Sequence, residues 1–141
     1  MTRNKGFTLI ELMVVILIVA ILAAVIIPML RARIDAAKWS EGRAGMGTIA
    51  TAARAYWAEH QDQATLLTAP TIGTLFPITS DLDGKYFEYA CYGITFQTYD
   101  TTNVAYTITC NGALSGRAGK PAAPASMTLT VATNGTSTWT P

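Results

Sequence analysis

Charged side chains are scarce in this sequence. Only 13% of the 141 residues are Asp, Glu, Lys or Arg, whereas soluble domains usually carry about 25%. Ten basic side chains against nine acidic ones give a formal net charge of +1. Nucleic-acid binding driven by bulk charge needs a large basic excess that displaces counterions. Nucleic acid is therefore not expected as a primary partner.

Groups that carry chemistry are equally scarce. The chain has one His, His60, and two Cys, too few for a zinc site built from Cys and His alone. No serine lies in a Gly-x-Ser-x-Gly elbow, and no phosphate-binding loop or dinucleotide fingerprint occurs. We interpret His60 as a solvated or capping side chain near the end of a helix. The sequence predicts a protein that is not an enzyme and has no catalytic residues.

Apolar residues, in contrast, are abundant and concentrated at one end. Residues 7–30 contain a single charge, Glu11, and a single proline, Pro28, and no charge follows between Leu12 and Leu30. As a helix, that uncharged stretch is about 28 Å long, close to the ~30 Å hydrocarbon core of a membrane. Arg3 and Lys5 precede it, which predicts a cytoplasmic N-terminus and an exported C-terminal part.

Three interpretations of this run are possible. A secretory signal peptide fits poorly, because the run is longer than a normal apolar region and has only loose small-residue cleavage sites. A permanent membrane anchor leaves Glu11 unexplained, since a carboxylate in hydrocarbon costs a few kcal/mol. The third possibility is that cleavage between Gly6 and Phe7 creates an α-amino group, which pairs with Glu11 of a neighbouring chain. At ~4 Å and an effective dielectric near 20, such a pair gains about 4 kcal/mol before desolvation.

The residues around Glu11 resemble the class III signal of type IV prepilins and type II secretion pseudopilins. The motif is a short basic leader, a glycine, an aromatic residue and Thr-Leu-Ile-Glu opening an apolar run. It covers Lys5-Gly6-Phe7-Thr8-Leu9-Ile10-Glu11-Leu12. The resemblance implies that a prepilin peptidase cleaves after Gly6 and methylates Phe7. It also implies that Glu11 acts in subunit assembly and that Pro28 is a helix-kinking proline.

Beyond residue 30 the pattern becomes amphipathic. Residues 31–61 alternate charged side chains with apolar ones at spacings of three and four, which predicts a continuation of the same helix. The full helix should run from Phe7 to roughly Gln61, about 80 Å. Gly42, Gly45 and Gly47 weaken it by up to about 1 kcal/mol each relative to Ala, so they mark either close packing or a soft spot.

Residues 62–141 predict a C-terminal β domain, after a loop from Ala64 to Pro77. Period-two alternation predicts strands over residues 86–96, with a bulge at Gly93, over 104–110 and over 127–131, with a turn at 100–103. The expected fold class is α+β and pilin-like: a long N-terminal helix packed on an antiparallel sheet of three or four strands. Residues 1–6 form the leader, 7–30 the membrane and filament-core helix, and 31–61 its amphipathic half.

Three further features concern the β domain. Cys91 and Cys110 fall on apolar faces of adjacent strands in an exported domain, which predicts a disulfide; two buried free thiols are the alternative. Asp81 and Asp83 resemble the start of a calcium loop but lack its full ligand spacing, so a plain turn is favoured and calcium is a weak candidate. Asn134-Gly135-Thr136 matches a glycosylation sequon.

These observations predict a structural subunit, the major pilin, of a type IV pilus or pilus-like filament. The expected partners are copies of the same chain, the prepilin peptidase and the pilus assembly machinery. The subunit should lie in the inner membrane before assembly and in an extracellular pilus afterwards. A type II secretion pseudopilin is the alternative, and a secreted binding domain with an ordinary signal peptide is a more distant one. The sequence does not separate adhesion, motility, DNA uptake and electron transport.

Overall fold

A computed structural model describes residues 6–60, 69–100 and 102–141 of the protein. The chain divides into two units, Met1–Ile34 and Asp35–Pro141, which are described separately. One long helix, α1, runs from Leu9 to His60 and belongs to both units. The predicted helix is confirmed, although Phe7 precedes it and Gln61 lies outside the described residues.

The first unit is helix without a core. Every described residue from Gly6 to Ile34 is exposed except Ala23, which is half-buried. An α-helix satisfies its own backbone hydrogen bonds, so it can persist in hydrocarbon without tertiary partners. This part of α1 is long and apolar enough to cross a membrane, and none of its most apolar window is buried inside the structure.

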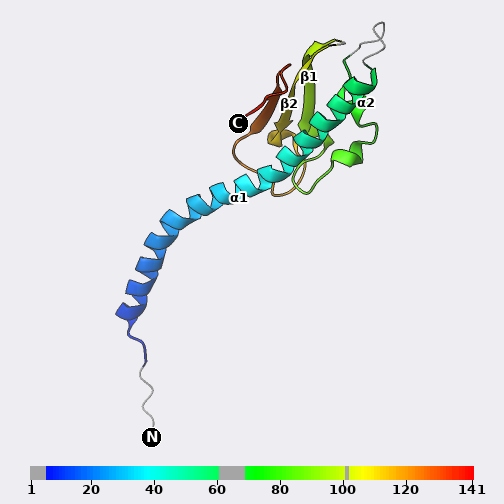
Figure 1. Cartoon of the computed structure of the whole chain (residues 1–141). Coiled ribbons are helices and arrows are strands. Elements are labelled where there is room, and N and C mark those ends of the chain that lie inside the picture. The colour runs from blue at the N-terminus through cyan, green and yellow to red at the C-terminus, as the bar shows by residue number, and fades with distance from the viewer. Residues whose placement is uncertain (1–5, 61–68, 101) are drawn as a thin grey trace. The chain divides into compact units, whose positions relative to one another are not determined.

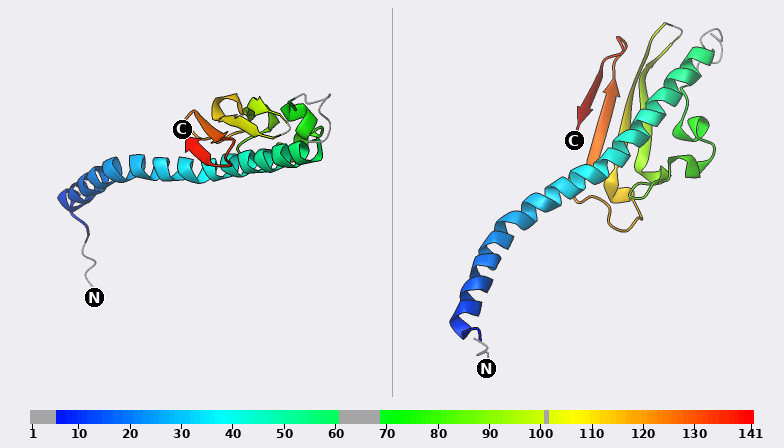
Figure 2. Two further views of the ribbon diagram at one scale, coloured as in Figure 1. Left: turned by 45° about the horizontal axis from the view of Figure 1, so that its top comes forward. Right: turned by 60° about the horizontal axis from the view of Figure 1, so that its bottom comes forward.

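The second unit lays a four-stranded antiparallel sheet on the second half of α1 (Figures 1 and 2). The strands are β1 (Tyr92–Tyr99), β2 (Val104–Asn111), β3 (Ser126–Val131) and β4 (Ser137–Thr140). They pair in the order β1-β2-β3-β4. The pilin-like α+β fold class is therefore confirmed.

The core lies between the helix and one face of the sheet. The buried helix positions repeat every three or four residues, as an apolar stripe requires; they are Trp39, Gly42, Met46, Ile49, Ala50 and Ala53. From the sheet, alternate residues point at this stripe; they are Tyr106, Ile108, Cys110, Met127, Leu129 and Val131. The opposite face carries threonines in register, with Thr107 beside Thr130 and Thr109 beside Thr128.

Short helices connect these elements. Helix α2, Ile72–Leu75, lies within the predicted loop of residues 64–77, of which 64–68 lie outside the described residues. The loop prediction was wrong there, because the Thr71 side chain caps the amide of Thr74 and starts a helical turn. In the described residues, three 3-10 turns follow: η1 (Thr79–Leu82), η2 (Tyr89–Cys91) and η3 (Gly112–Leu114).

The predicted start of the first strand was also wrong. Tyr89–Cys91 forms η2, and β1 begins only at Tyr92. The backbone amides of Tyr86 and Phe87 donate to Oε1 of Glu41 on α1, at 2.7 and 2.9 Å, instead of to a neighbouring strand. These bonds hold Phe87 against Trp39 with ring centroids 4.8 Å apart. The alternation of apolar and polar residues in this segment therefore reflects which side chains are buried, although the segment does not pair as a strand.

The predicted bulge lies elsewhere as well. Gly93 pairs regularly with Thr109, and the register shifts between Phe96 and Thr98. The predicted turn before β2 is confirmed by its described residues, since Oδ1 of Asp100 accepts the amides of Thr102 and Asn103. Strand β4 was not located from the sequence, because its four residues are all exposed and show no apolar alternation.

Candidate functional site

The N-terminal end of α1 is built around Thr8 and Glu11. The hydroxyl of Thr8 accepts the backbone amide of Glu11 at 3.3 Å. Oε2 of Glu11 accepts the Thr8 amide at 2.9 Å and the Thr8 hydroxyl at 2.6 Å. This is a capping box, in which the residue before the helix and the third helical residue satisfy each other's free amides. It fixes the first turn of the helix.

The capping box is not among the sequence-based predictions, which give Glu11 only a cation as its partner. The Thr-x-x-Glu spacing of Thr8 and Glu11 was the available signal. The hydrogen bonds from Thr8 orient the carboxylate without neutralising its charge, and they leave its other oxygen, Oε1, out of the box. The need for a positive partner in an apolar environment therefore stands, and pairing with a neighbouring chain stays a prediction.

The predicted cleavage junction precedes this box. Gly6 and Phe7 are both exposed and lie outside the helix, and a Cβ added to Gly6 would have nothing within 4 Å. Phe7 is 87% exposed. A protease needs an accessible peptide outside regular secondary structure, so the geometry is compatible with the predicted cut. The basic residues Arg3 and Lys5 lie outside the described residues.

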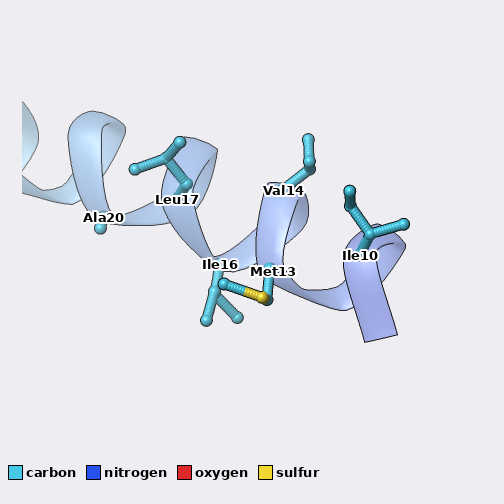
Figure 3. A pocket seen from close by; sticks show the side chains of 6 residues that line it. All are labelled: Ile10, Met13, Val14, Ile16, Leu17 and Ala20. Carbon is cyan, nitrogen blue, oxygen red and sulfur yellow. The ribbon is translucent and has the colours of Figure 1, made fainter. Parts of the chain in front are cut away.

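The side of α1 that follows the box is continuously apolar. A shallow hollow of about 680 Å³ lies along it, and Figure 3 shows the six side chains that line it. Its lining residues all come from successive turns of this one helix: Ile10, Met13, Val14, Ile16, Leu17 and Ala20. Soluble monomers rarely expose continuous apolar surface of such extent, and surfaces of this kind mark a membrane or a protein interface.

Pro28 lies inside α1, which continues on both sides of it. A proline has no amide hydrogen to donate to the carbonyl four residues earlier, which is that of Ala24. The helix is therefore weakened at this turn. The predicted kink in the filament stays a prediction.

Cys91 and Cys110 are both buried, 2% and 0% exposed, and the structure has them as free thiols. Cys110 pairs with Tyr92, the residue after Cys91, so the two cysteines occupy neighbouring positions at one end of the β1–β2 pair. Burial raises the pKa of the Cys110 thiol to about 12, and the proximity of Cys91 and Glu41 adds to this effect. The disulfide stays a prediction.

Of the two calcium candidates, Asp83 has protein partners for its carboxylate. Asp83 accepts the amide of Tyr89 at 3.0 Å and forms an ion pair with Arg117 at 3.1 Å. Asp81 lies in η1, where its amide donates to the carbonyl of Ile78. Within residues 6–60, 69–100 and 102–141, no group of three or more His, Cys, Asp or Glu side chains could hold a metal ion.

His60 ends α1, as the sequence indicated. Its ring stacks on Tyr56 with centroids 4.1 Å apart, and its Nδ1 lies 2.7 Å from the Tyr56 carbonyl oxygen. As the Nδ1–H tautomer it donates to this carbonyl, which lies in the last turns of the helix. This contact is structural.

Comparisons with known proteins agree with the site at the start of α1. Residues 1–27 match the family model described as the prokaryotic N-terminal methylation motif. The start of the chain thus carries a prepilin-type N-terminal methylation motif. It is similar to the type IV major pilin protein PilA of Myxococcus xanthus (strain DK1622), with 42% identity over 57 residues. The aligned part is 40% of this chain and 26% of that relative. No solved structure matches the chain.

Proposed function

We propose that this chain is the major subunit of a type IV pilus or pilus-like filament. A prepilin peptidase cuts between Gly6 and Phe7 and methylates the new amine of Phe7. The subunit then waits in the inner membrane with the second unit on the outer side. Assembly machinery in that membrane transfers it into an extracellular filament, in which the apolar helices form the core.

The observation that carries the proposal is the exposed apolar half of α1 with one carboxylate near its start. In the membrane, lipid covers this surface. In a filament, the same surface packs against copies of itself, and the exchange of lipid for protein contacts is favoured by close packing more than by the hydrophobic effect. An ordinary membrane anchor needs no carboxylate there, whereas an assembling helix uses one.

Glu11 supplies the polar part of the interaction. An ionised carboxylate at membrane depth costs about 2.5–3.5 kcal/mol on insertion scales. Removal of the leader creates an amine at Phe7, and a neighbouring subunit displaced along the filament can bring its amine to Glu11. Because the capping box fixes the carboxylate on the first turn, this pairing defines one axial displacement between subunits.

The decisive experiment separates the charge of Glu11 from its capping role. Glu11→Gln removes the charge and keeps a side chain that still serves in a capping box. Thr8→Val removes the hydroxyl and keeps the charge. We expect surface filaments to be lost in Glu11→Gln and to persist in Thr8→Val, as counted by electron microscopy of sheared fibres.

The control is Glu59→Gln, which neutralises an exposed acid near the other end of α1 and should leave filaments unchanged. All variants must first show the processed N-terminus by mass spectrometry. Wild-type numbers of filaments from processed Glu11→Gln would contradict the proposal. A mature chain that begins well inside residues 7–30 would instead indicate a secreted domain, and wild-type cells without long fibres would favour a type II secretion pseudopilin.

A further inference from the structure

The sequence contains two Asn-Gly pairs, Asn111-Gly112 and Asn134-Gly135. An asparagine before glycine is prone to lose its amide, because glycine has no Cβ to hinder attack by its backbone nitrogen. Sequence alone makes the two pairs equivalent. The structure places them in opposite environments.

The first pair is held in place by the core of the second unit. Gly112 is buried, and its amide donates to the carbonyl of Ala125 at 2.9 Å. A Cβ added there would meet the rings of Trp39 at 3.4 Å and Phe87 at 3.5 Å. The nucleophilic nitrogen would therefore have to leave a long-range hydrogen bond inside the core before it could react.

The second pair is exposed to solvent. Asn134 and Gly135 form the exposed turn between β3 and β4, and Gly135 has a φ of 80° with nothing within 4 Å of an added Cβ. The Gly135 amide donates only within the turn, to the carbonyl of Ala132 at 2.9 Å. Such local bonds at loop tips open at small free-energy cost.

Thr136 adds an activating contact. Oδ1 of Asn134 accepts the Thr136 amide at 3.0 Å and the Thr136 hydroxyl at 2.7 Å. The first of these bonds closes an Asx-turn, whose small ring contains the peptide between Asn134 and Gly135. Both donors point at the oxygen on which negative charge develops when Cγ is attacked, as in an oxyanion hole.

We infer that Asn134 is a site of spontaneous deamidation and that Asn111 is protected from it. The Gly135 nitrogen loses its proton and bonds to Cγ of Asn134, the Cγ–Nδ2 bond breaks, and ammonia leaves with the proton. Solvent water then opens the resulting succinimide to an aspartyl residue or to its isoaspartyl isomer. No oxidant, enzyme or cofactor is needed.

The two products affect the hairpin differently. The aspartyl product keeps the acceptor oxygen for both Thr136 donors and adds one negative charge to an exposed turn. The isoaspartyl product inserts a carbon into the backbone between residues 134 and 135. The extra carbon disturbs the hydrogen bond that the Ala132 amide donates to the Thr136 carbonyl oxygen, which is 2.9 Å long in the intact turn. The pairing of β4 with β3 is loosened as a result.

The test is incubation of the full processed chain in detergent at mildly alkaline pH, followed by peptide mass spectrometry of both sites. We expect Asn134 to convert while Asn111 stays intact, and both to convert at similar rates in denaturant. Thr136→Val should slow the folded-state conversion about tenfold, less than the 10²–10³ of an enzymatic oxyanion hole because water partly replaces the hydroxyl. Thr136→Ser keeps the hydroxyl and should retain the wild-type rate.

Three outcomes would overturn the inference. They are conversion of Asn111 at least as fast as Asn134 in the folded chain, an unchanged rate in Thr136→Val, and a glycan on Asn134 of the native protein, which would block its amide nitrogen.

Discussion

At the scale of single residues, Asp35 joins the first turn of the second unit to a distant loop. Its Oδ2 accepts the amides of Ala122 at 3.1 Å and Ala123 at 3.3 Å, and its Oδ1 lies 3.3 Å from Nζ of Lys38. Partial desolvation acts to raise the pKa of Asp35. The Ala122 amide, Lys38 and the Ala123 amide together outweigh it and lower the pKa below its ordinary value.

This lowered pKa predicts a loss of stability in acid. Asp35 binds a proton less readily in the folded chain than in the unfolded chain. Its contribution to the free energy of unfolding is therefore complete above its ordinary pKa of 3.8, and it is lost as the pH falls through the lower pKa of the folded state. The free energy of unfolding of wild type should exceed that of Asp35→Asn at neutral pH, and the difference should shrink in acid. Urea titrations at several pH values measure it. A difference that grows in acid would contradict the assignment.

The two cysteines allow a second prediction at this scale. With a thiol pKa of about 12, reduced Cys110 in the folded domain should react with alkylating agents about a thousandfold more slowly near pH 8 than an ordinary thiol, because only the thiolate reacts. In protein exported through an oxidising compartment, Cys91 and Cys110 should resist alkylation even after unfolding, until a reductant is added. Rapid labelling of unfolded, unreduced protein would exclude the disulfide.

At the scale of elements, the glycines of α1 have different roles. A Cβ at Gly45 would overlap the ring and hydroxyl of Tyr92, whereas a Cβ at Gly47 would meet nothing within 4 Å. Gly45 therefore permits close approach of β1 to the helix. Gly47 is a weak point of the helix, since a glycine there costs helix stability and gains no packing contact.

This contrast predicts opposite effects for two substitutions in one helix. Gly45→Ala should destabilise the domain, by roughly 1–3 kcal/mol as for other overpacked sites. Gly47→Ala should stabilise it by about 0.5–1 kcal/mol, because alanine favours the helix and restricts the unfolded chain. Urea unfolding followed by circular dichroism compares them. Equal signs for the two variants would refute the packing role of Gly45.

Elements with strong periodicity could be predicted from the sequence, and those held by single polar contacts could not. The alternation of Val104, Tyr106 and Ile108 predicted β2, because one face of that strand is buried. The absence of strand pairing at Tyr86 and Phe87 follows from two hydrogen bonds to Glu41, which lies 45 residues earlier than Tyr86. A contact of that sequence separation leaves no periodic signal.

The candidate site shows the same division. The motif around Gly6, Phe7 and Glu11 was visible in the sequence, since its spacing and apolar context are specific. The hydrogen bonds from Thr8 to Glu11 are seen in the coordinates, and the Thr-x-x-Glu spacing is the sequence signal that could have indicated them.

At the scale of the whole molecule, all buried residues of the described chain belong to the second unit. The earliest buried residue is Trp39, 1% exposed, whose indole donates to the carbonyl of Pro124 at 3.1 Å. The first unit adds nothing to this core. Under the proposed function its free energy is instead set by the membrane or by neighbouring helices, so we expect the core of the second unit to fold independently of it.

The last prediction follows from this separation. A chain beginning at Met29 lacks most of the apolar run and keeps Asp35 and the entire core, so it should be soluble and unfold cooperatively in urea. A chain beginning at Gly47 also loses Trp39 and Met46, 1% and 0% exposed. Because each large core side chain is worth roughly 2–5 kcal/mol and a domain has only about 5–15 kcal/mol in total, this second chain should not fold. Far-UV circular dichroism with urea titration distinguishes the two, and an insoluble or unfolded Met29 chain would show that the first unit is needed for folding.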